Sequence, residues 1–306
     1  MITQKRRIMT RHREYVLITA ARNEAAYIAR TIESVCMQTI RPSKWVIVSD
    51  GSTDETDEII KKYAVKHNFI FFQRRECGCN RPDFASKAFA LEDGYRWLQG
   101  LEYHYIGILD ADITFEATYY EEVLKRFYTN TRLGICGGFV YEKINGLFKS
   151  RPTNSTRSVA GGIQFFQREC YEKIGGIMPS KSGGEDWMAE ISARMAGWEV
   201  AAFPELAVHH HKPGSSVRGT ARECIRQGKM DYAIGSHPLF EIFKCVRRVK
   251  VKPFFIGSIL RIFGYAHAWA SGEKRVMLPE AMAFLRAEQL NRIKHSLQDS
   301  RIWRLL

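Results

Sequence analysis

Two stretches near the N-terminus decide the fold: Tyr15-Val16-Leu17-Ile18-Thr19 and Trp45-Val46-Ile47-Val48-Ser49-Asp50-Gly51-Ser52-Thr53-Asp54. Each is a short apolar run that ends in polar residues, which is the pattern of a strand buried on both faces. Between them, Glu24 to Gln38 has the periodicity of an amphipathic helix, with apolar residues recurring from Ile28 and with Asn23 as the expected N-cap. Strand, helix and strand in this order predict parallel strands joined by a crossover helix.

The alternation continues further along the chain and weakens after residue 130. Helices are expected at Glu55–Val65, Ser86–Leu98 and Glu185–Ala196, and strands at Phe69–Gln73, Tyr105–Leu109, Leu133–Val140, Gly161–Gln167 and Trp198–Phe203. The sequence therefore predicts an α/β fold, with a Rossmann-like, mostly parallel and doubly wound central sheet flanked by helices.

Composition and charge divide the chain into two parts. Its 306 residues are 45% hydrophobic and 26% charged, which is typical of a globular protein and excludes a disordered, fibrous or disulfide-stapled chain. Of the net charge of +13, residues 213–306 carry +10, from 17 Lys and Arg against 7 Asp and Glu. We predict one domain over residues 1–212 that carries the chemistry, and a helical, basic C-terminal region over residues 213–306 with Pro238, Pro253 and Pro279 as helix breakers.

The least polar stretch of the C-terminal region is Phe254 to Gly272, interrupted only by Arg261. A central arginine disfavours a membrane-spanning helix. The basic run Arg247–Lys252 precedes the stretch and Lys274 and Arg275 follow it, as expected of a segment lying in the headgroup region of an anionic leaflet. A buried helical hairpin that closes the core is the alternative.

Cysteine usage and the N-terminus bear on the compartment. The seven cysteines are odd in number and contain no C-x-x-C pair, so free thiols in a reducing compartment are expected. Cys77 and Cys79 are too close in sequence for a structural zinc site. The basic segment Met1–Arg13 is not followed by an apolar run of signal-peptide type. We therefore expect a cytoplasmic protein, peripheral at the cytoplasmic face of the membrane.

Polar residues follow three of the expected strands, at Asn23-Glu24, Asp50 and Asp110-Ala111-Asp112. Ligands of doubly wound sheets bind beyond these carboxyl ends. Two carboxylates spaced i, i+2 can turn toward one divalent cation, Mg²⁺ or Mn²⁺, that also holds a diphosphate, although acid pairs also occur in solvated turns. Asp50 can accept hydrogen bonds from a base or ribose, and Lys87 can face a phosphate or base.

Two glycine pairs lie near further candidate residues. Glu185 and Asp186 follow Gly183-Gly184 at an expected helix start, where a carboxylate serves either as a general base for an attacking hydroxyl or as a complement to the helix dipole. The Gly161-Gly162 pair allows close approach of a bulky ligand, or simply forms a turn.

The run His209-His210-His211 is a candidate source of a third metal ligand. Side chains two residues apart on an extended segment point to the same side, so either His209 and His211, or His210 alone, would face the metal. A solvated polar turn is the alternative.

Taken together, these motifs resemble family 2 glycosyltransferases with the glycosyltransferase A-type fold. The motifs occur in family order over about residues 15–212: Val16-Leu17-Ile18-Thr19-Ala20-Ala21-Arg22-Asn23-Glu24, Ser34 to Gln38 before Pro42, Val46-Ile47-Val48-Ser49-Asp50-Gly51-Ser52-Thr53-Asp54, Ser86-Lys87-Ala88 with Gly94, Asp110-Ala111-Asp112, Gly161-Gly162, and Gly184-Glu185-Asp186-Trp187. The C-terminal region, with Gly228, Gly235–Pro238 and Gly264-Tyr265, resembles the ends of bacterial and archaeal members that build cell-surface polysaccharides on lipid carriers.

The resemblance implies a metal-dependent, inverting enzyme with a glycosyltransferase A-type catalytic domain over residues 1–212. The donor would be a nucleotide sugar, with UDP the commonest nucleotide, the cofactor Mn²⁺ or Mg²⁺, and the acceptor a hydroxyl of a glycan or lipid-linked molecule in polysaccharide or glycoconjugate biosynthesis. Carried over by position, the donor-binding residues border the nucleotide (Ala20, Arg22, Glu24), bind the nucleobase (Asp50), bind the nucleobase or phosphate (Lys87) and bind the ribose (Asp110 with Ala111). The resemblance assigns the metal to Asp110 and Asp112, and the catalytic base to Asp186 with Glu185. It places Gly161, Gly162 and Trp187 beside the acceptor.

Three other function classes compete with this interpretation. A nucleotidyltransferase acting on sugar phosphates would share the sheet and the acids, but no glycine-rich, basic loop follows the first strand. A nucleic-acid-binding protein would explain the positive charge, but that charge lies in the apolar C-terminal region and no recognised module is present, so no nucleic-acid partner is expected. A non-catalytic, membrane-binding relative is disfavoured because Asp50, Asp110, Asp112 and Asp186 are all present.

Overall fold

A computed structural model describes residues 14–76, 84–212, 220–248 and 254–298. The expectations for Met1–Arg13, for Cys77 and Cys79, and for the segment from Val249 to Pro253 lie outside the described residues. By its contacts the chain divides into two compact units. Unit 1 comprises residues 1–179 and 185–213, and unit 2 comprises residues 180–184 and 214–306.

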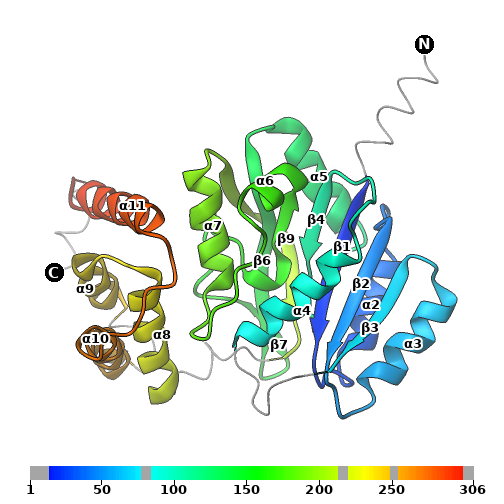
Figure 1. The fold of residues 1–306 in the computed structure, drawn as a ribbon, viewed down its shortest axis with the longest axis horizontal. Helices are drawn as coiled ribbons and strands as arrows, with labels where there is room; N and C mark the ends of the chain where they lie inside the picture. The colour runs from blue at the N-terminus through cyan, green and yellow to red at the C-terminus, as the bar shows by residue number, and fades with distance from the viewer. Residues whose placement is uncertain (1–13, 77–83, 213–219, 249–253, 299–306) are drawn as a thin grey trace. The chain divides into compact units, whose positions relative to one another are not determined.

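Unit 1 is built on a mixed sheet of nine strands in the order β3-β2-β1-β4-β8-β6-β9-β5, with β7 paired to β6 (Figure 1). The strands are β1 (Tyr15–Ala21), β2 (Lys44–Asp50), β3 (Ile70–Arg75), β4 (Tyr105–Ile108), β5 (Ile113–Phe115), β6 (Leu133–Ile144), β7 (Leu147–Ser150), β8 (Phe165–Gln167) and β9 (Glu199–His210). The first four are parallel, β8 is antiparallel to β4 and β6, and β9 runs parallel to β6. The carboxyl ends of β1, β2 and β4 therefore meet at one edge of the sheet.

Helices cover both faces of this sheet. They are α2 (Ile28–Cys36), α3 (Thr56–Lys66), α4 (Phe84–Arg96), α5 (Tyr119–Thr129), α6 (Arg168–Lys173) and α7 (Glu185–Met195), with a 3₁₀ turn at Gly161–Ile163. Gly94 of α4 lies so close to Ile18 and Val48 that an added Cβ would meet both side chains. On the other face the ring of Tyr120 from α5 lies 4.9 Å from that of Tyr15.

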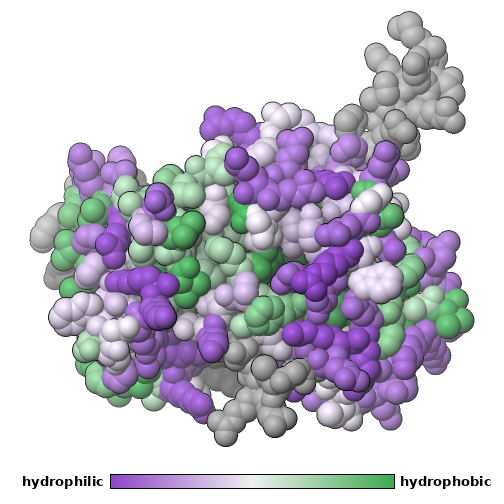
Figure 2. Space-filling model, in the orientation of Figure 1, coloured by the Kyte–Doolittle hydropathy of each residue, from purple (hydrophilic) through white to green (hydrophobic). Residues whose placement is uncertain are grey.

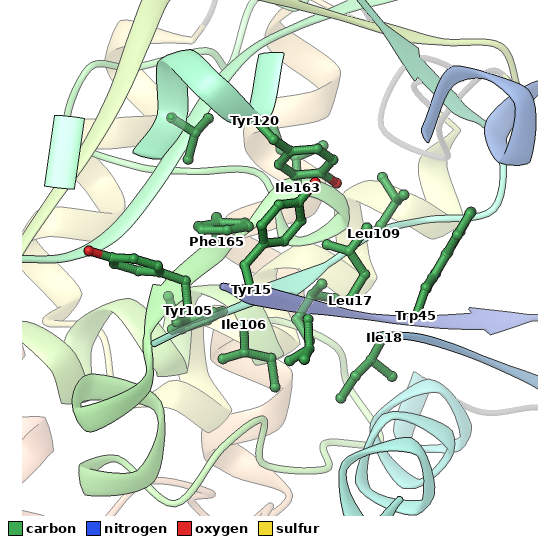
Figure 3. Close-up of a cluster of buried hydrophobic side chains, with 14 of the residues drawn as sticks. Tyr15, Leu17, Ile18, Trp45, Tyr105, Ile106, Leu109, Tyr120, Ile163 and Phe165 are labelled. Atoms are coloured by element: carbon green, nitrogen blue, oxygen red, sulfur yellow. The ribbon is translucent and has the colours of Figure 1, made fainter. Parts of the chain in front are cut away.

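The core fills the sheet faces with large apolar side chains (Figure 3). Tyr15, Leu17 and Ile18 of β1 are fully buried, as are Trp45 of β2 and Phe165 of β8. The buried Trp45 indole donates to Thr19 Oγ1 at 2.9 Å, so its polar atom is satisfied within the core. This rigid core fixes where β1, β2 and β4 end.

Unit 2 is helical in its described part. Its helices are α8 (Ala221–Ile234), α9 (Pro238–Arg247), α10 (Phe254–Ala270) and α11 (Pro279–Gln298). Pro238 and Pro279 begin helices rather than end them, because the first turn needs no N–H donor from proline. The backbones of α8 and α10 approach closely, since a Cβ on Gly228 would overlap the carbonyl of Arg261 and one on Gly264 that of Ile225. No helix among the described residues is long and apolar enough to cross a membrane.

The prediction of the first helix was wrong at its start. Asn23 does not cap it, because Asn23 adopts a left-handed φ of 53° and its side chain bonds to a neighbouring loop. The helix begins at Ile28 instead of near Glu24, after a turn in which the amides of Tyr27 and Ile28 donate to the Glu24 carbonyl.

Candidate functional site

The loops after β1 and β2 are joined by side chain to backbone hydrogen bonds. Asn23 Oδ1 accepts from the Thr53 amide at 2.8 Å, and the Asn23 amide donates to Ser52 Oγ at 3.2 Å. The Glu24 amide donates to Thr56 Oγ1 at 2.8 Å. These bonds explain the strained backbone at Asn23, and they fix Arg22 and Glu24 beside the end of β2. Ala20 is half-buried near the end of β1, just before Arg22 in the chain.

Asp50, the last residue of β2, is 4% exposed and surrounded by donors. Arg75 Nη1 lies 3.0 Å from Asp50 Oδ1, Arg22 Nη1 lies 3.6 Å from Oδ2, and the Ser86 hydroxyl donates to Oδ2. The structure thus places Asp50 beside Arg22, two residues that the resemblance assigns to the donor nucleotide. It also adds Arg75 and Ser86, which sequence reasoning did not select, although Ser86 stands within the quoted Ser86-Lys87-Ala88 motif.

Asp110 follows β4 and pairs with Lys87, whose Nζ lies 2.5 Å from Asp110 Oδ1. Burial opposes ionisation of Asp110, but the Lys87 ammonium prevails and holds the pKa of that carboxyl below its ordinary value. The neighbouring Ala111 is buried, and its carbonyl accepts from Thr31 Oγ1 of α2 at 2.8 Å. The acidic turn is therefore anchored on both sides.

Asp112 is paired with His210, whose Nε2 lies 3.0 Å from Asp112 Oδ2. Burial disfavours the imidazolium, yet the hydrogen bond to Asp112 outweighs it and raises the pKa of His210. Neighbouring side chains on β9 point to opposite faces, so His209 packs against Phe148, with ring centroids 4.5 Å apart. His211 Nε2 lies 2.8 Å from Thr114 Oγ1. Of the two sequence-based alternatives, the structure brings His210 alone to the acids, not His209 and His211.

A second ion pair lies behind His210 and was missed from the sequence. Arg151 Nη2 is 2.7 Å from Glu142 Oε1 and 3.3 Å from His210 Nδ1. Glu142 belongs to β6 and is 1% exposed. Because β6 and β9 are paired residue by residue, Glu142 and His210 are register partners. Only the strand pairing brings these residues together, so no local sequence signal could have found them.

Glu24 is the third carboxylate near the two aspartates after β4. Lys212 Nζ lies 2.6 Å from Glu24 Oε1. Burial raises the pKa of Glu24, Lys212 opposes that rise, and the charges of Asp112 and Asp110 add to it. Glu24 thus shares the field of the acidic turn.

The Gly161-Gly162 pair separates Asp186 from Asp110. The Gly161 amide donates to Asp186 Oδ2 at 3.1 Å, and the Gly162 carbonyl accepts from the Asp110 amide at 2.9 Å. An added Cβ on Gly161 would lie 2.8 Å from Asp186 Cβ, and one on Gly162 would overlap the Asp110 carboxylate. Glycine is required here by close approach, so the pair is more than a turn.

Asp186 lies in the first turn of α7, between the half-buried Glu185 and Trp187. One turn further along α7, Glu190 is 1% exposed, and its Oε1 accepts from the Val159 amide at 2.6 Å and from Ser158 Oγ at 3.0 Å. Burial raises the pKa of Glu190 to about 7, against the Val159 amide and Arg194. Glu190 therefore ties the segment before Gly161 to the helix that carries Asp186. No local sequence signal indicated this contact.

The side chains after β4 and at the end of β9 are of the chemical types that bind divalent cations. Asp112, Asp110 and His210 offer carboxylate oxygens and an imidazole nitrogen, which are ligand types that Mn²⁺ accepts. In the described chain no group of three His, Cys, Asp or Glu side chains is gathered closely enough to hold a metal ion. Asp112 and His210 are already within hydrogen-bond distance of each other.

Comparison with family models assigns most of unit 1. Residues 16–185 match the model described as glycosyl transferase family 2, and residues 148–229 match that of glycosyltransferase-like family 2. Poly-beta-1,6-N-acetyl-D-glucosamine synthases of Staphylococcus aureus and Staphylococcus epidermidis are 32% identical over 123 residues, which are 40% of this chain and 27% of theirs. The chain therefore spans about a quarter of the length of these relatives.

Solved structures match the fold at low sequence identity. A mannosyltransferase from Pyrobaculum calidifontis, solved with GDP-Man and Mn²⁺, aligns with a TM-score of 0.54 and 19% identity over 95% of this chain and 82% of that one. GalNAc-T7, solved with UDP, GalNAc and Mn²⁺, aligns with a TM-score of 0.55 and 14% identity, over 86% of this chain and 55% of that one. S. aureus TarS 1-349 aligns with a TM-score of 0.51 and 13% identity, over 85% of this chain and 72% of that one. The predicted glycosyltransferase A-type fold is confirmed.

Proposed function

Because the chain belongs to glycosyltransferase family 2, we propose that it moves a sugar from a nucleotide-sugar donor, in the first instance a UDP-sugar, to a hydroxyl of a glycan or lipid-linked acceptor, with inversion at the anomeric carbon. The product would be a polysaccharide or glycoconjugate. The supporting observation is the Gly161-Gly162 turn, which holds Asp186 on one side and Asp110 on the other. In this proposal Asp110 is the acid on the donor side and Asp186 the acid on the acceptor side, with the glycine pair between them.

On the donor side, Asp50 would accept hydrogen bonds from the base, with Arg22 and Arg75 holding its carboxylate in place. Ala20 and Glu24 would border the nucleotide. Lys87 would contribute positive charge toward the diphosphate, and Asp110 and Ala111 would contact the ribose. A strand-end position suits these roles because parallel sheets bind ligands beyond their carboxyl ends.

Asp112, His210 and Asp110 would hold Mn²⁺ or Mg²⁺, with the donor diphosphate and water as the remaining ligands. The bound ion would neutralise the charge that develops on the departing nucleoside diphosphate.

On the acceptor side, Asp186 would take the proton from the attacking hydroxyl, so that the oxygen adds to the anomeric carbon on the face opposite the diphosphate. The Gly161 amide donates to Asp186 Oδ2 at 3.1 Å and the Trp187 amide donates to Oδ1 at 2.9 Å, so backbone donors hold this carboxylate in place. Gly161, Gly162 and Trp187 would border the acceptor, and Glu185 stands beside the base.

The test is Asp186→Asn, assayed by nucleoside diphosphate release from UDP-, GDP- and dTDP-sugars and by titration of UDP, GDP and dTDP with Mn²⁺. We expect turnover to fall by about 10²- to 10⁴-fold, because general-base catalysis contributes that much, while nucleotide affinity stays within about threefold. Glu169→Gln is the matched control, since Glu169 is an exposed acid in the first turn of α6. Equal loss of nucleotide binding and turnover would refute the role of Asp186.

A further inference from the structure

The described part of unit 2 buries a cluster of charged side chains beside its apolar residues, and it exposes large apolar side chains on α9 and α10. Asp231, Glu241 and Arg261 are 0%, 2% and 8% exposed. Arg261 Nε lies 2.9 Å from Asp231 Oδ2 and 3.0 Å from Glu241 Oε1, and Lys244 Nζ lies 2.8 Å and 2.7 Å from the same two carboxylates. Two cations and two anions therefore pair within this cluster, and the arginine in the middle of α10 points inward.

The outward side of α9 and α10 carries large apolar side chains. On α9 they are Leu239, Ile242 and Val246, and on α10 Phe255, Ile256, Ile259, Ile262, Phe263 and Trp269, which are 39–70% exposed. We call these residues the α9–α10 apolar surface. On α10 the buried positions are Ser258, Arg261, Gly264 and Ala268, so one stripe is polar or small and the remainder is apolar. Figure 2 shows hydrophobic residues among hydrophilic ones on the visible face of these helices.

Exposed cations lie at the end of α9 and shortly after the end of α10. Arg247 is the last residue of α9, and Lys274 follows the end of α10 at Ala270. The acids of this unit are mostly used internally: besides Asp231 and Glu241, Glu223 pairs with Arg226 and Glu273 with Lys229. Arg247 and Lys274 therefore remain as exposed cations beside the α9–α10 apolar surface.

We propose that the α9–α10 apolar surface docks in the headgroup region of an anionic lipid bilayer, with α10 lying in the plane of the membrane. Large apolar residues flanked by cations fit this occupant, because the acyl boundary takes the apolar side chains and anionic headgroups take the cations. A second copy of the chain fits worse, since two like-charged rims would meet. The inward Arg261 removes the objection that a charge in mid-helix would face lipid.

The test measures flotation of the full chain with vesicles of phosphatidylcholine alone or mixed with phosphatidylglycerol. We expect binding to the mixed vesicles and little to the neutral ones. The triple variant Ile259→Gln, Phe263→Gln and Trp269→Gln should bind the mixed vesicles more than tenfold more weakly, because three exposed apolar side chains are lost. The double variant Arg247→Gln, Lys274→Gln should bind the anionic vesicles several-fold more weakly, and its binding to the neutral vesicles should not change.

The controls distinguish this proposal from general stickiness and from self-association. Val65→Gln and Leu147→Gln remove exposed apolar side chains of unit 1 and should leave vesicle binding unchanged. Brominated lipids should quench the fluorescence of the wild type more than that of Trp269→Phe. Equal binding of the triple variant and the wild type would overturn the proposal. A wild-type dimer that forms without vesicles, together with a monomeric triple variant, would also overturn it. Nucleotide titration of the same variants reports separately on the proposed function.

Discussion

At the residue scale, the charges of the candidate site are already paired with one another. Lys87 holds Asp110, His210 holds Asp112, Lys212 holds Glu24 and Arg75 holds Asp50. Paired charges lower the desolvation cost of gathering so many ionised groups beside a buried core. A diphosphate and a divalent ion would bring the opposite charges that these groups now supply to each other. In the proposed function, these groups would exchange their internal partners for ligand partners without leaving a charge isolated.

Glu190 gives the residue-scale prediction, on stability. Its pKa is about 7 in the folded chain against an ordinary 4.5, so between these values the folded state binds the additional proton. Stability contributed by the protonated form is present below pH 4.5 and is lost as the pH rises toward 7. In Glu190→Gln the amide oxygen still accepts from Val159 and Ser158, but nothing titrates. From pH 5 to pH 8 the unfolding free energy of the wild type should fall relative to this variant by about 2–3 kcal/mol.

Urea unfolding at the two pH values measures this difference, with Glu169→Gln as the exposed-acid control. A difference between wild type and Glu190→Gln that stays constant with pH would contradict the raised pKa.

At the element scale, the parallel strands and their helices could be predicted and the pairings across the sheet could not. The apolar runs at Tyr15 and Trp45 and the acids after them are local signals, and β1, β2 and β4 lie within one or two residues of the expected strands. The helix α5 (Tyr119–Thr129) was missed although its pattern is helical, since Tyr120, Val123, Leu124 and Phe127 are buried on one face and the first turn after Thr118 is acidic. The meeting of Glu142 with His210, and of Glu190 with Val159, depends on contacts between distant segments that sequence spacing cannot encode.

The alternation of β9 provides the element-scale prediction. His210 faces Asp112 while His209 faces Phe148, so one strand offers a test residue and a neighbouring control of the same chemistry. His210→Ala should weaken Mn²⁺-dependent binding of nucleoside diphosphate by about tenfold or more, because one of the proposed ligands is lost. His209→Ala should change it less than about twofold. The measurement is a nucleotide titration with and without Mn²⁺, and the reverse order of effects would assign the metal to the other face of the strand.

At the scale of the whole molecule, the proposed chemistry and the surplus charge belong to different units. All the candidate site residues lie in unit 1, and residues 1–212 carry a net charge of only +3 out of +13. Unit 2 has its own buried cluster of ion pairs, and the remaining +10 is carried by residues 213–306. The loop of residues 180–184 packs with unit 2, where Arg226 donates to the Ser182 carbonyl at 2.7 Å, and it leads directly into α7 and Asp186.

This division predicts how ligands change thermal unfolding. A ligand that binds the native state alone stabilises it by mass action, by about 2.7 kcal/mol at a concentration of 100 times its Kd. For a unit of about 200 residues that amounts to a rise in Tm of roughly 5–10 °C. Because the site lies in unit 1, calorimetry with one of UDP, GDP or dTDP and Mn²⁺ should raise the transition of unit 1 and leave that of unit 2 in place. Chelator, or Asp112→Asn in the presence of Mn²⁺, should remove most of the rise. A nucleotide shift that is the same with chelator would show that Asp112 and His210 act without a metal, and a shift of both transitions together would show that the two units unfold as one.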